Sequence, residues 1–383
     1  MKVLFISNDP TIFDATSAAR ARMRTYAALM GEAHILSSAD RNAKEEQDGN
    51  LFLHPVRSLK LFRVRTLTLR AHVLIAKYGI EIVSAQDPFE HGLAALRAVH
   101  GTNAKLHIQV HTDFLSPWFV KVGNLRNIRI AFLNRYRRRI ADRVLPTAAG
   151  IRSVSERVKT SLIARYKSTI PEPSVIPIAV STEIPEDVEL PAHNFNFALI
   201  AIGRLEPEKH TEDILTALSL ITKRYPMIGL FIVGSGRERG RLERMVRSLN
   251  LRNRVIFLGE RNDARALMGR AQAFIQASVY EGYGRTLIEA ALAGIPIITT
   301  DVGIVGEVFK SGESALVSPP GDIKTLSLNI TKCIEDMKIR EELPMRAEGA
   351  AREHLLQQDS RMGVGAVSFP ARIAGDLERL LSS

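Results

Sequence analysis

Short apolar runs alternate with longer amphipathic stretches along the whole chain. The first run, residues 2–7, ends in the turn-forming Asn8-Asp9-Pro10 and predicts a buried first strand. Runs of the same kind predict further strands in the first half at residues 34–38, 51–54, 81–85, 105–111, 143–146, 153–155 and 175–180. Helical patterns lie between them at residues 15–29, 67–77, 92–99 and 127–141, and another helix is expected to begin at Ser155-Glu156. Strands that alternate with helices predict a parallel α/β sheet of the Rossmann kind.

The second half repeats this alternation after a stretch without hydrophobic period. Residues 182–196 hold two prolines and several acids, which is typical of a linker. Beyond it, strands are predicted at residues 197–202, 229–233, 255–258, 273–277, 296–299 and 315–317. Helices are predicted at residues 211–224, 237–249, 263–269, 285–293 and 323–336, with a final helix at 371–381. We therefore expect two Rossmann-like domains, 1–184 and 197–350, joined by a linker over 185–196 and followed by a C-terminal segment, 351–383.

Composition fits a folded two-domain protein in a reducing compartment. The chain has 383 residues, of which 45% are hydrophobic and 24% are charged, as in ordinary globular domains. Its single cysteine, Cys333, has no partner for an intrachain disulfide. The first apolar run is too short for a signal peptide, and no run approaches the roughly 20 apolar residues of a membrane-spanning helix. We expect a cytoplasmic protein, either free in solution or peripheral at the inner face of the membrane.

Positive charge is concentrated in the first half. The net charge is +11, and residues 121–167 alone hold 13 basic residues against two acids. Four arginines lie within residues 135–139, and apolar neighbours make this segment amphipathic. Two interpretations stay open: a solvated helix face, or a surface that binds an anionic membrane. No motif of nucleic-acid-binding proteins is present, so we do not expect a nucleic-acid partner.

One stretch of the second domain carries the clearest candidate chemistry. After a predicted buried strand, Gly282 and Gly284 let the backbone turn tightly and approach a ligand. The helix expected from Arg285 presents unpaired N–H groups at its start, which form a ready anion site. Glu281 precedes this helix start, and Glu289 lies about one turn inside it. A phosphate site flanked by acids that could hold hydroxyls suggests a sugar nucleotide, although an acid before a helix can equally serve the helix dipole.

A second candidate group follows the strand predicted at residues 197–202. Gly203 frees the backbone at the strand end, Arg204 offers a planar fork of donors, and Lys209 offers a point charge. Both cations could meet a diphosphate at the carboxyl end of the sheet, where open α/β folds bind ligands. They would stabilise the charge that gathers on a leaving diphosphate. The alternative is a solvated basic loop.

Weaker candidates lie on later loops of the same domain. The turn at Gly234 is a plain Gly-x-Gly, and Arg261 follows a predicted strand. Gly303 is expected to serve a turn. Glu307 is balanced between contact with a ligand and capping of a helix.

In the first domain, His111 closes a predicted strand and Asp113 follows it. A histidine at a strand end is normally structural. Trp118 and Phe119 come next, beside Lys121. This pair could touch an acceptor or a lipid interface, or it could be a helix packed on the core.

Two of these stretches resemble a known family. Glu281-Gly-Tyr-Gly-x(4)-Glu289-Ala-x-x-Ala-Gly-x-Pro resembles the Glu-x(7)-Glu signature of the retaining glycosyltransferases of family four, which have the GT-B fold. Gly203-Arg204-Leu-Glu-Pro-Glu-Lys209 resembles the Gly-Arg-Leu…Glu-Lys-Gly motif of the same family, except that His210 replaces the usual glycine. The resemblance is strong over residues 197–322 and only architectural over much of 1–190.

The first domain departs from the family pattern in two places. No glycine pair follows the first strand, so the acceptor side is expected to use Ser17 with Arg20 or Arg24. The family's Pro-Asn-Gly-Val-Asp is replaced by Pro177-Ile-Ala-Val-Ser181.

The resemblance implies two Rossmann-like domains facing across a cleft, with a C-terminal helix that crosses back to the first domain. It implies a metal-independent, retaining hexosyltransferase that moves a sugar from a UDP- or GDP-sugar to a glycan or a lipid-linked acceptor. The nucleoside-diphosphate sugar is then a co-substrate, and no cofactor or metal is expected. The implied catalytic residues are His111, Arg204, Lys209 and Glu281. The resemblance implies that His111 contacts a sugar hydroxyl without activating a nucleophile. The implied donor-binding residues are Gly203, Gly234, Arg261, Gly282, Tyr283, Gly284, Arg285, Thr286 and Glu289.

Two other hypotheses stay open from the sequence. A sugar-nucleotide epimerase or hydrolase on the same fold would need an acid/base group beside the sugar, for which His111 and Asp113 are the evident candidates. A non-enzymatic basic module that binds membrane or nucleic acid would rest on charge alone.

Overall fold

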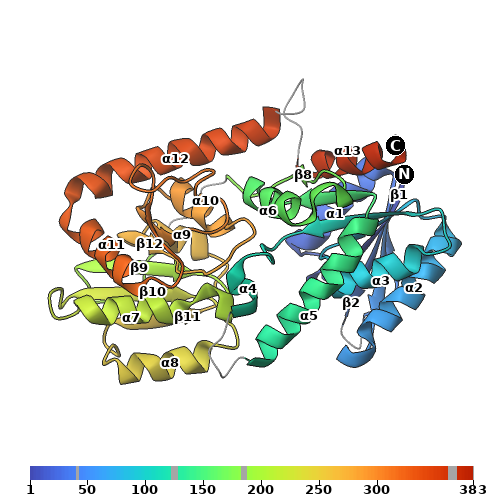
Figure 1. The fold of residues 1–383 in the computed structure, drawn as a ribbon. Helices are drawn as coiled ribbons and strands as arrows, with labels where there is room; N and C mark the ends of the chain where they lie inside the picture. Colours follow the sequence, from blue (N-terminus) through green and yellow to red (C-terminus); the bar gives the residue numbers. More distant parts are fainter. Residues whose placement is uncertain (40–42, 122–127, 183–187, 361–368, 383) are drawn as a thin grey trace. The chain divides into compact units, whose positions relative to one another are not determined.

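The computed structural model describes residues 1–39, 43–121, 128–182, 188–360 and 369–382, without the side chains of 358–360 and 369. The chain forms two compact units. Unit 1 comprises Met1–Leu115, Phe132–Pro177 and Asp359–Ser383, and unit 2 comprises Ser116–Ala131 and Ile178–Gln358. Figure 1 shows an α/β layer structure in each. Every helix of the described part is too short or too polar to cross a membrane.

Unit 1 is built on an eight-stranded sheet with the order β3-β4-β2-β1-β5-β6-β7-β8. Its strands are β1 (Lys2–Ser7), β2 (Glu32–Ser38), β3 (Glu46–Asp48), β4 (Leu51–Val56), β5 (Ile82–Ala85), β6 (Lys105–Val110), β7 (Gly150–Ser153) and β8 (Ser174–Val175). All recorded pairings are parallel except that of β3 with β4. Parallel pairing places the carboxyl ends of β1, β5 and β6 at one edge, where His111 follows β6.

The helices of unit 1 cover the sheet and bury its apolar strands. They are α1 (Ala18–Met30), α2 (Arg63–Tyr78), α3 (Glu90–Val99), α5 (Ile128–Val144), α6 (Glu156–Tyr166) and α13 (Phe369–Ser382), with 3-10 turns η1 (Pro10–Phe13), η2 (Lys60–Phe62), η4 (Leu145–Thr147) and η5 (Lys167–Thr169). Val3 and Phe5 pack in one cluster with Met23 of α1 and Leu377 of α13. The C-terminal helix is therefore part of the core of unit 1.

Unit 2 is built on a six-stranded parallel sheet with the order β11-β10-β9-β12-β13-β14. Its strands are β9 (Phe197–Ile202), β10 (Ile228–Val233), β11 (Val255–Gly259), β12 (Ala273–Ile275), β13 (Ile297–Thr300) and β14 (Leu316–Ser318). Its helices are α4 (Pro117–Lys121), α7 (Thr211–Ile221), α8 (Arg239–Ser248), α9 (Ala264–Met268), α10 (Arg285–Leu292), α11 (Ile323–Glu335) and α12 (Met337–Ser360), with the turn η6 (Pro207–Lys209). The buried faces of β9, β10, β12 and α7 form one core.

Most predicted strands and helices are confirmed, and three strand predictions are wrong. In place of the strand expected at residues 153–155 the structure has β7 (Gly150–Ser153), and Ser155 caps α6. Residues 143–146 instead belong to the end of α5 and to η4. Val144 and Leu145 are buried, as in a strand, but they reach the core from a helical turn and a 3-10 turn. The strand predicted at residues 175–180 is only the short β8. The sequence pattern did not predict β3 or α12. The expected domain boundaries at 184, 196 and 350 stay predictions. The first of them falls among residues 183–187, which lie outside the described part.

Candidate functional site

The loops at the carboxyl ends of β9 and β10 touch each other through their backbones. A Cβ atom on Gly234 would lie 2.0 Å from the carbonyl oxygen of Gly203. The amide of Gly203 donates to the carbonyl of Val233 at 3.0 Å. Gly234 therefore has a packing role, because any side chain there would push the two loops apart.

Lys209 and Glu281, which are 72 residues apart in sequence, form an ion pair in unit 2. Ser278 donates its hydroxyl to Oε1 of the same carboxylate at 2.8 Å. The side chains of Lys209 and Glu281 are 21% and 14% exposed, so neither is a freely solvated surface charge. The amide of Val279 donates to the carbonyl of Glu208 at 2.9 Å, which ties the two loops together. Two residues predicted from separate motifs thus share one site.

Arg204 lies on the open side of this site. Its side chain is 76% exposed, and Nη2 donates to Oε1 of Glu208 at 3.3 Å. An exposed guanidinium held by one weak ion pair can turn toward an anion at little cost. Arg261 is also engaged, because it makes two bonds of 2.7 and 2.5 Å to the carboxylate of Asp263.

The start of α10 is open to an anion. Gly284 is its N-cap in the left-handed conformation (φ 93°), and no side chain caps the helix. The first amides of α10 therefore keep the donor capacity that a capping side chain would otherwise use. The hydroxyl of Thr286 donates to Oε1 of Gln276 at the end of β12, at 2.9 Å. This bond holds the first turn of α10 against the sheet.

Glu289 lies on the second turn of α10, where its side chain is only 15% exposed. Burial raises the pKa of Glu289, and the ion pair with Arg285 at 3.0 Å partly offsets that rise. A carboxylate with so little water around it gains from new hydrogen-bond donors.

Tyr283 of the signature loop points into unit 2. Its side chain is 1% exposed, and its hydroxyl lies 3.1 Å from Nε2 of His354 on α12. A donor could therefore meet only the backbone of Tyr283. Gly303 packs on that backbone, because a Cβ there would lie 2.3 Å from the carbonyl oxygen of Tyr283. Glu307 lines a different cavity of about 470 Å³ between the loop after β13 and α12.

The backbone at His210 has the conformation that the glycine of the family motif would adopt. It adopts the left-handed conformation (φ 45°, ψ 41°), which glycine accepts most easily. Burial lowers its pKa, but the hydrogen bond to Asp213 at 3.0 Å more than compensates, so the pKa of His210 is raised. The turn expected at this position is therefore kept with a larger residue.

The aromatic pair after His111 is a packed element of unit 2. Trp118 meets the ring of His210 edge to face, with 5.7 Å between ring centroids. Phe119 is 4% exposed and meets Tyr280 at 5.6 Å. Phe119 therefore fits the second of the two alternatives, a helix packed on the core. Its ring supports the loop that carries Glu281.

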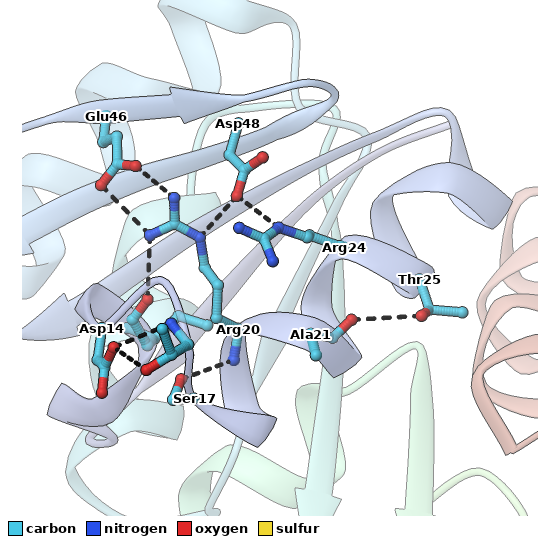
Figure 2. A network of polar contacts seen from close by, with 10 residues as sticks. Asp14, Ser17, Arg20, Ala21, Arg24, Thr25, Glu46 and Asp48 are labelled. Carbon is cyan, nitrogen blue, oxygen red and sulfur yellow. Dashed lines mark hydrogen bonds and ion pairs between the residues drawn. The ribbon is translucent and has the colours of Figure 1, made fainter.

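The loop after β1 uses its polar residues internally, as Figure 2 shows. Ser17 caps α1 by accepting from the amide of Arg20 at 3.0 Å. Arg20 is 1% exposed and pairs with Glu46 and Asp48 of β3, while Arg24 donates to Asp48 at 2.7 Å. Arg20 is thus held inside unit 1 by its ion pairs, and the expectation that Ser17 serves the acceptor with Arg20 or Arg24 stays a prediction. Arg24 remains 44% exposed.

His111 lies at the end of β6 in unit 1, where Nε2 is 3.1 Å from Oε1 of Gln109. Burial and the nearby Arg152 lower the pKa of His111 to about 3, so the ring is neutral near pH 7. Sequence reasoning missed Gln109 and Arg152, as it missed Ser278 and Gln276 in unit 2. The available signal was that Gln109, Gln276 and Ser278 are polar residues at strand ends, close in sequence to predicted site residues.

Solved structures match the whole chain. Sucrose-phosphate synthase from Thermosynechococcus elongatus has 19% identity, covers 100% of this chain and 99% of its own, and gives a TM-score of 0.77. HepE of Anabaena, solved with UDP and glucose, has 20% identity, covers 99% of this chain and 100% of its own, and gives a TM-score of 0.69. These likenesses place the chain in the class of GT-B folds, and the predicted fold class is confirmed.

Family models extend this result. Residues 22–184 match the model described as Glycosyltransferase Family 4, and residues 187–353 match Glycosyl transferases group 1. The two models together span most of the chain, which belongs to the family-four, group-1 glycosyltransferases.

Among curated relatives, glycogen synthase of Mycobacterium tuberculosis is 31% identical over 140 residues, 36% of this chain and 34% of the relative. A 2-deoxystreptamine N-acetyl-D-glucosaminyltransferase of Niallia circulans is 26% identical over 151 residues, 39% of each chain. The matched region thus spans little more than a third of these relatives.

Proposed function

We propose that this protein is a retaining glycosyltransferase that moves a hexose from a UDP- or GDP-sugar to a glycan or a lipid-linked acceptor. The observation that carries the proposal is the Lys209–Glu281 pair in unit 2. It joins the two motifs that resemble the family. HepE, which has the same fold, was solved with UDP, which supports a nucleoside-diphosphate site in this class.

The cations would act on the leaving group. As the bond between sugar and diphosphate breaks, negative charge gathers on the phosphate oxygens. Lys209 and Arg204, together with the open amides of Arg285 and Thr286, are positioned on loops of unit 2 to stabilise that charge. Lys209 is already held by Glu281 before the reaction, whereas the exposed Arg204 would turn toward the phosphate.

The two carboxylates would bind hydroxyls. Glu281 accepts from Ser278 and Lys209 and retains acceptor capacity for a hydroxyl of the sugar. Glu289 would accept from the ribose. Among the residues that the structure describes, its carboxylate is bonded only to the exposed Arg285, whose side chain can move aside.

The experiment that tests the proposal has two parts. Thermal unfolding is followed with UDP-, GDP- and ADP-sugars, since a ligand that binds only the folded state raises its stability. The best donor is then incubated with candidate acceptors, with and without EDTA, and the anomeric configuration of the product is read by NMR. We expect transfer with retained configuration and no loss with EDTA. An inverted product, an epimerised donor, hydrolysis alone, or abolition by EDTA would each contradict the proposal.

We also propose that the acceptor is reached at an anionic membrane surface. On α5, Phe132 and Tyr136 are 72% and 52% exposed, and the exposed Arg135, Arg139 and Arg143 follow at four-residue spacing. Within the described chain, no carboxylate lies within ion-pair distance of these three arginines. Exposed apolar side chains flanked by free cations suit lipid headgroups over a basic interfacial region.

A second segment of unit 1 has the same character. Leu61 and Phe62 of η2 are 85% and 52% exposed, next to the exposed Lys60. α3 contacts both α2, which follows η2, and α5, so the three helices form one layer (Figure 1). The sequence had indicated only residues 121–167 for this role.

A further inference from the structure

A chain of buried polar side chains crosses unit 1 and ends at His111. Asp376 of α13 lies 3.4 Å from Nε2 of His107, whose Nδ1 lies 2.9 Å from the hydroxyl of Ser84. Ser84 in turn lies 3.0 Å from the side-chain amide of Gln109. Five side chains of this system are at most 6% exposed: Ser84, His107, Gln109, Arg152 and Asp376.

Gln109 is the branch point of this chain. Its Oε1 lies 2.7 Å from Nη1 of Arg152 and 3.1 Å from Nε2 of His111. Arg152 is held in turn by the carbonyls of Ile176 and Pro177, at 2.9 and 3.0 Å. The guanidinium therefore has no freedom to leave Gln109.

Around Gln109, the positions of the protons follow from which groups can only donate a hydrogen bond. A guanidinium only donates, so the Gln109 atom that faces Arg152 must be its carbonyl oxygen. His111 Nε2 lies against that same oxygen and must therefore carry a proton. The Gln109 amide then donates to Ser84, whose hydroxyl lies 2.9 Å from Nδ1 of His107. Nε2 of His107 lies 3.4 Å from Asp376 and makes no hydrogen bond with the described residues.

The neutral His111 ring consequently has its lone pair on Nδ1. Within the described residues, this atom has no hydrogen-bond partner, and it is not among the buried polar atoms left without one. A lone pair open at the carboxyl edge of the sheet can accept a hydrogen bond but cannot donate one.

We propose that Gln109 and Arg152 are positioning residues that fix His111 in its Nε2–H tautomer and so make Nδ1 an obligatory acceptor for a substrate hydroxyl. The substrate part of this inference rests on the proposed function and on the expectation from the family motif that His111 contacts a sugar hydroxyl. It adds a specificity rule: the sugar must present a free hydroxyl there, since an O-methyl group or an acceptor atom would leave Nδ1 unpaired.

Burial first, and then the charges around His111, lower its pKa and keep the ring neutral. Arg152 on β7, Arg22 on α1 and His107 on β6 disfavour a second proton, and Asp87 after β5 is the carboxylate that favours it. A change from Gln109 to glutamate would add a second carboxylate in direct contact with the ring. The pKa of His111 should then rise, and protonation would turn Nδ1 from acceptor to donor.

The test is made on the full-length protein labelled with ¹⁵N-histidine. Two-dimensional NMR of the imidazole nitrogens identifies the tautomer, and the His111→Gln variant assigns the signal. We expect a single Nε2–H form in the wild type, a mixture in Gln109→Leu, and the wild-type form in Ser84→Ala. Ser84→Ala is the matched control, because it breaks the same buried chain but leaves the Arg152–Gln109–His111 contacts intact.

Kinetics supply a second readout. Gln109→Leu should lower kcat/KM about tenfold, as expected for loss of one oriented hydrogen bond. Gln109→Glu should add an acid limb to the pH profile of kcat/KM, which a merely structural residue would not do. An Nδ1–H or mixed tautomer in the wild type, or loss of the tautomer in Ser84→Ala as well, would overturn the proposal. A wild type with the Nε2–H form but no transferase activity would count against the proposed function only.

Discussion

At the scale of single residues, the site depends on pairs and not on isolated charges. Lys209 and Glu281 neutralise each other in unit 2. Ser278 donates to the same oxygen of Glu281 that Lys209 contacts, and so helps to fix the carboxylate. Removing either partner leaves the other partly buried and unpaired, which costs more than the pair itself contributes. The same carboxylate and ammonium are the groups proposed to meet the sugar and the diphosphate.

Lys209→Ala should therefore lower transfer at least a hundredfold, because it removes a cation that stabilises the leaving group. Glu281→Gln should lower it by a similar factor while keeping the shape of the site. Initial rates with the best donor and acceptor measure both effects. Lys332→Ala is the matched control, since Lys332 is an exposed lysine on α11 of the same unit. Near-normal turnover of Lys209→Ala would refute the site assignment.

The backbone at His210 gives a second prediction at this scale. His210 has φ 45°, so His210→Gly should be more stable than His210→Ala by about 1 kcal/mol, because only alanine brings a Cβ into the left-handed region. Both variants lose the bond to Asp213 and the contact with Trp118, so these losses cancel in the comparison. Urea-denaturation midpoints of the two variants measure the difference. Equal midpoints would show that the turn relaxes when the imidazole is removed.

At the scale of elements, hydrophobic periodicity predicted the two parallel sheets and most of their helices. It failed where burial does not follow a simple period. Residues 143–146 look like a strand because Val144 and Leu145 are apolar, yet they close α5. α12 was missed because its apolar residues do not gather on one face and Pro344 lies inside it. The ion pairs of Arg20 with Glu46 and Asp48 join residues 26 and 28 positions apart, which no local pattern reveals.

Motif spacing predicted more of the donor side than of the first unit. The cations and acids of unit 2 lie on loops that immediately follow strands, so their place at the sheet edge follows from strand order. The position of α4 in unit 2 did not follow, because Pro117–Lys121 lies within the first half of the sequence. Gln109 and Arg152 read as ordinary strand residues until β6 and β7 are paired.

Substitution of two glycines tests how tightly the loop of Gly303 packs on the loop of Tyr283 in unit 2. Gly303→Ala would place a methyl group 2.3 Å from the carbonyl oxygen of Tyr283. We expect at least about 2 kcal/mol of lost stability beyond the backbone strain itself. Gly312→Ala is the matched control, because Gly312 also has positive φ (77°) but open space around its Cβ position. The free energies of unfolding from urea titrations should separate the two variants, and equal losses would argue that the loop around Tyr283 moves freely.

The β2–β4 pair predicts how stability depends on pH. His34 Nδ1 lies 3.0 Å from His54 Nε2, and both rings are buried. Burial and the neighbouring His34 lower the pKa of His54 to about 4. The ordinary pKa of histidine, about 6.5, applies in the unfolded chain. Between about pH 4 and about pH 6.5, His54 is therefore protonated in the unfolded state and neutral in the folded state.

Stability should therefore be complete above about pH 6.5 and fall toward about pH 4, by up to about 3 kcal/mol from this histidine. Urea titrations at about pH 7 and about pH 5 measure the loss. His54→Gln should make the pH dependence shallower. An unchanged slope in His54→Gln would rule out this histidine as its source.

At the scale of the whole molecule, the charge of unit 1 and its exposed apolar residues lead to one testable consequence. The net charge of +11 attracts any anionic surface, so charge alone would give weak and salt-sensitive adhesion. Insertion of Phe132 and Leu61 would add a hydrophobic contribution that salt does not screen. Binding that survives high salt thus distinguishes a docking surface from simple ionic attraction.

We expect the protein to float with vesicles that contain phosphatidylglycerol and not with pure phosphatidylcholine. Replacing Arg135, Arg139 and Arg143 by glutamine should reduce binding at least tenfold, since each cation near the surface contributes about 1 kcal/mol. Replacing Arg244, Arg247 and Arg252 removes the same charge from exposed positions of unit 2 and should leave binding nearly intact. Phe132→Ser with Leu61→Ser should abolish the salt-resistant fraction, whereas Leu220→Ser with Leu328→Ser, which are also apolar and more than half exposed but lie on unit 2, should not. If both arginine triples weaken binding alike, the protein is attracted by its net charge and the surface on α5 and η2 has no special role.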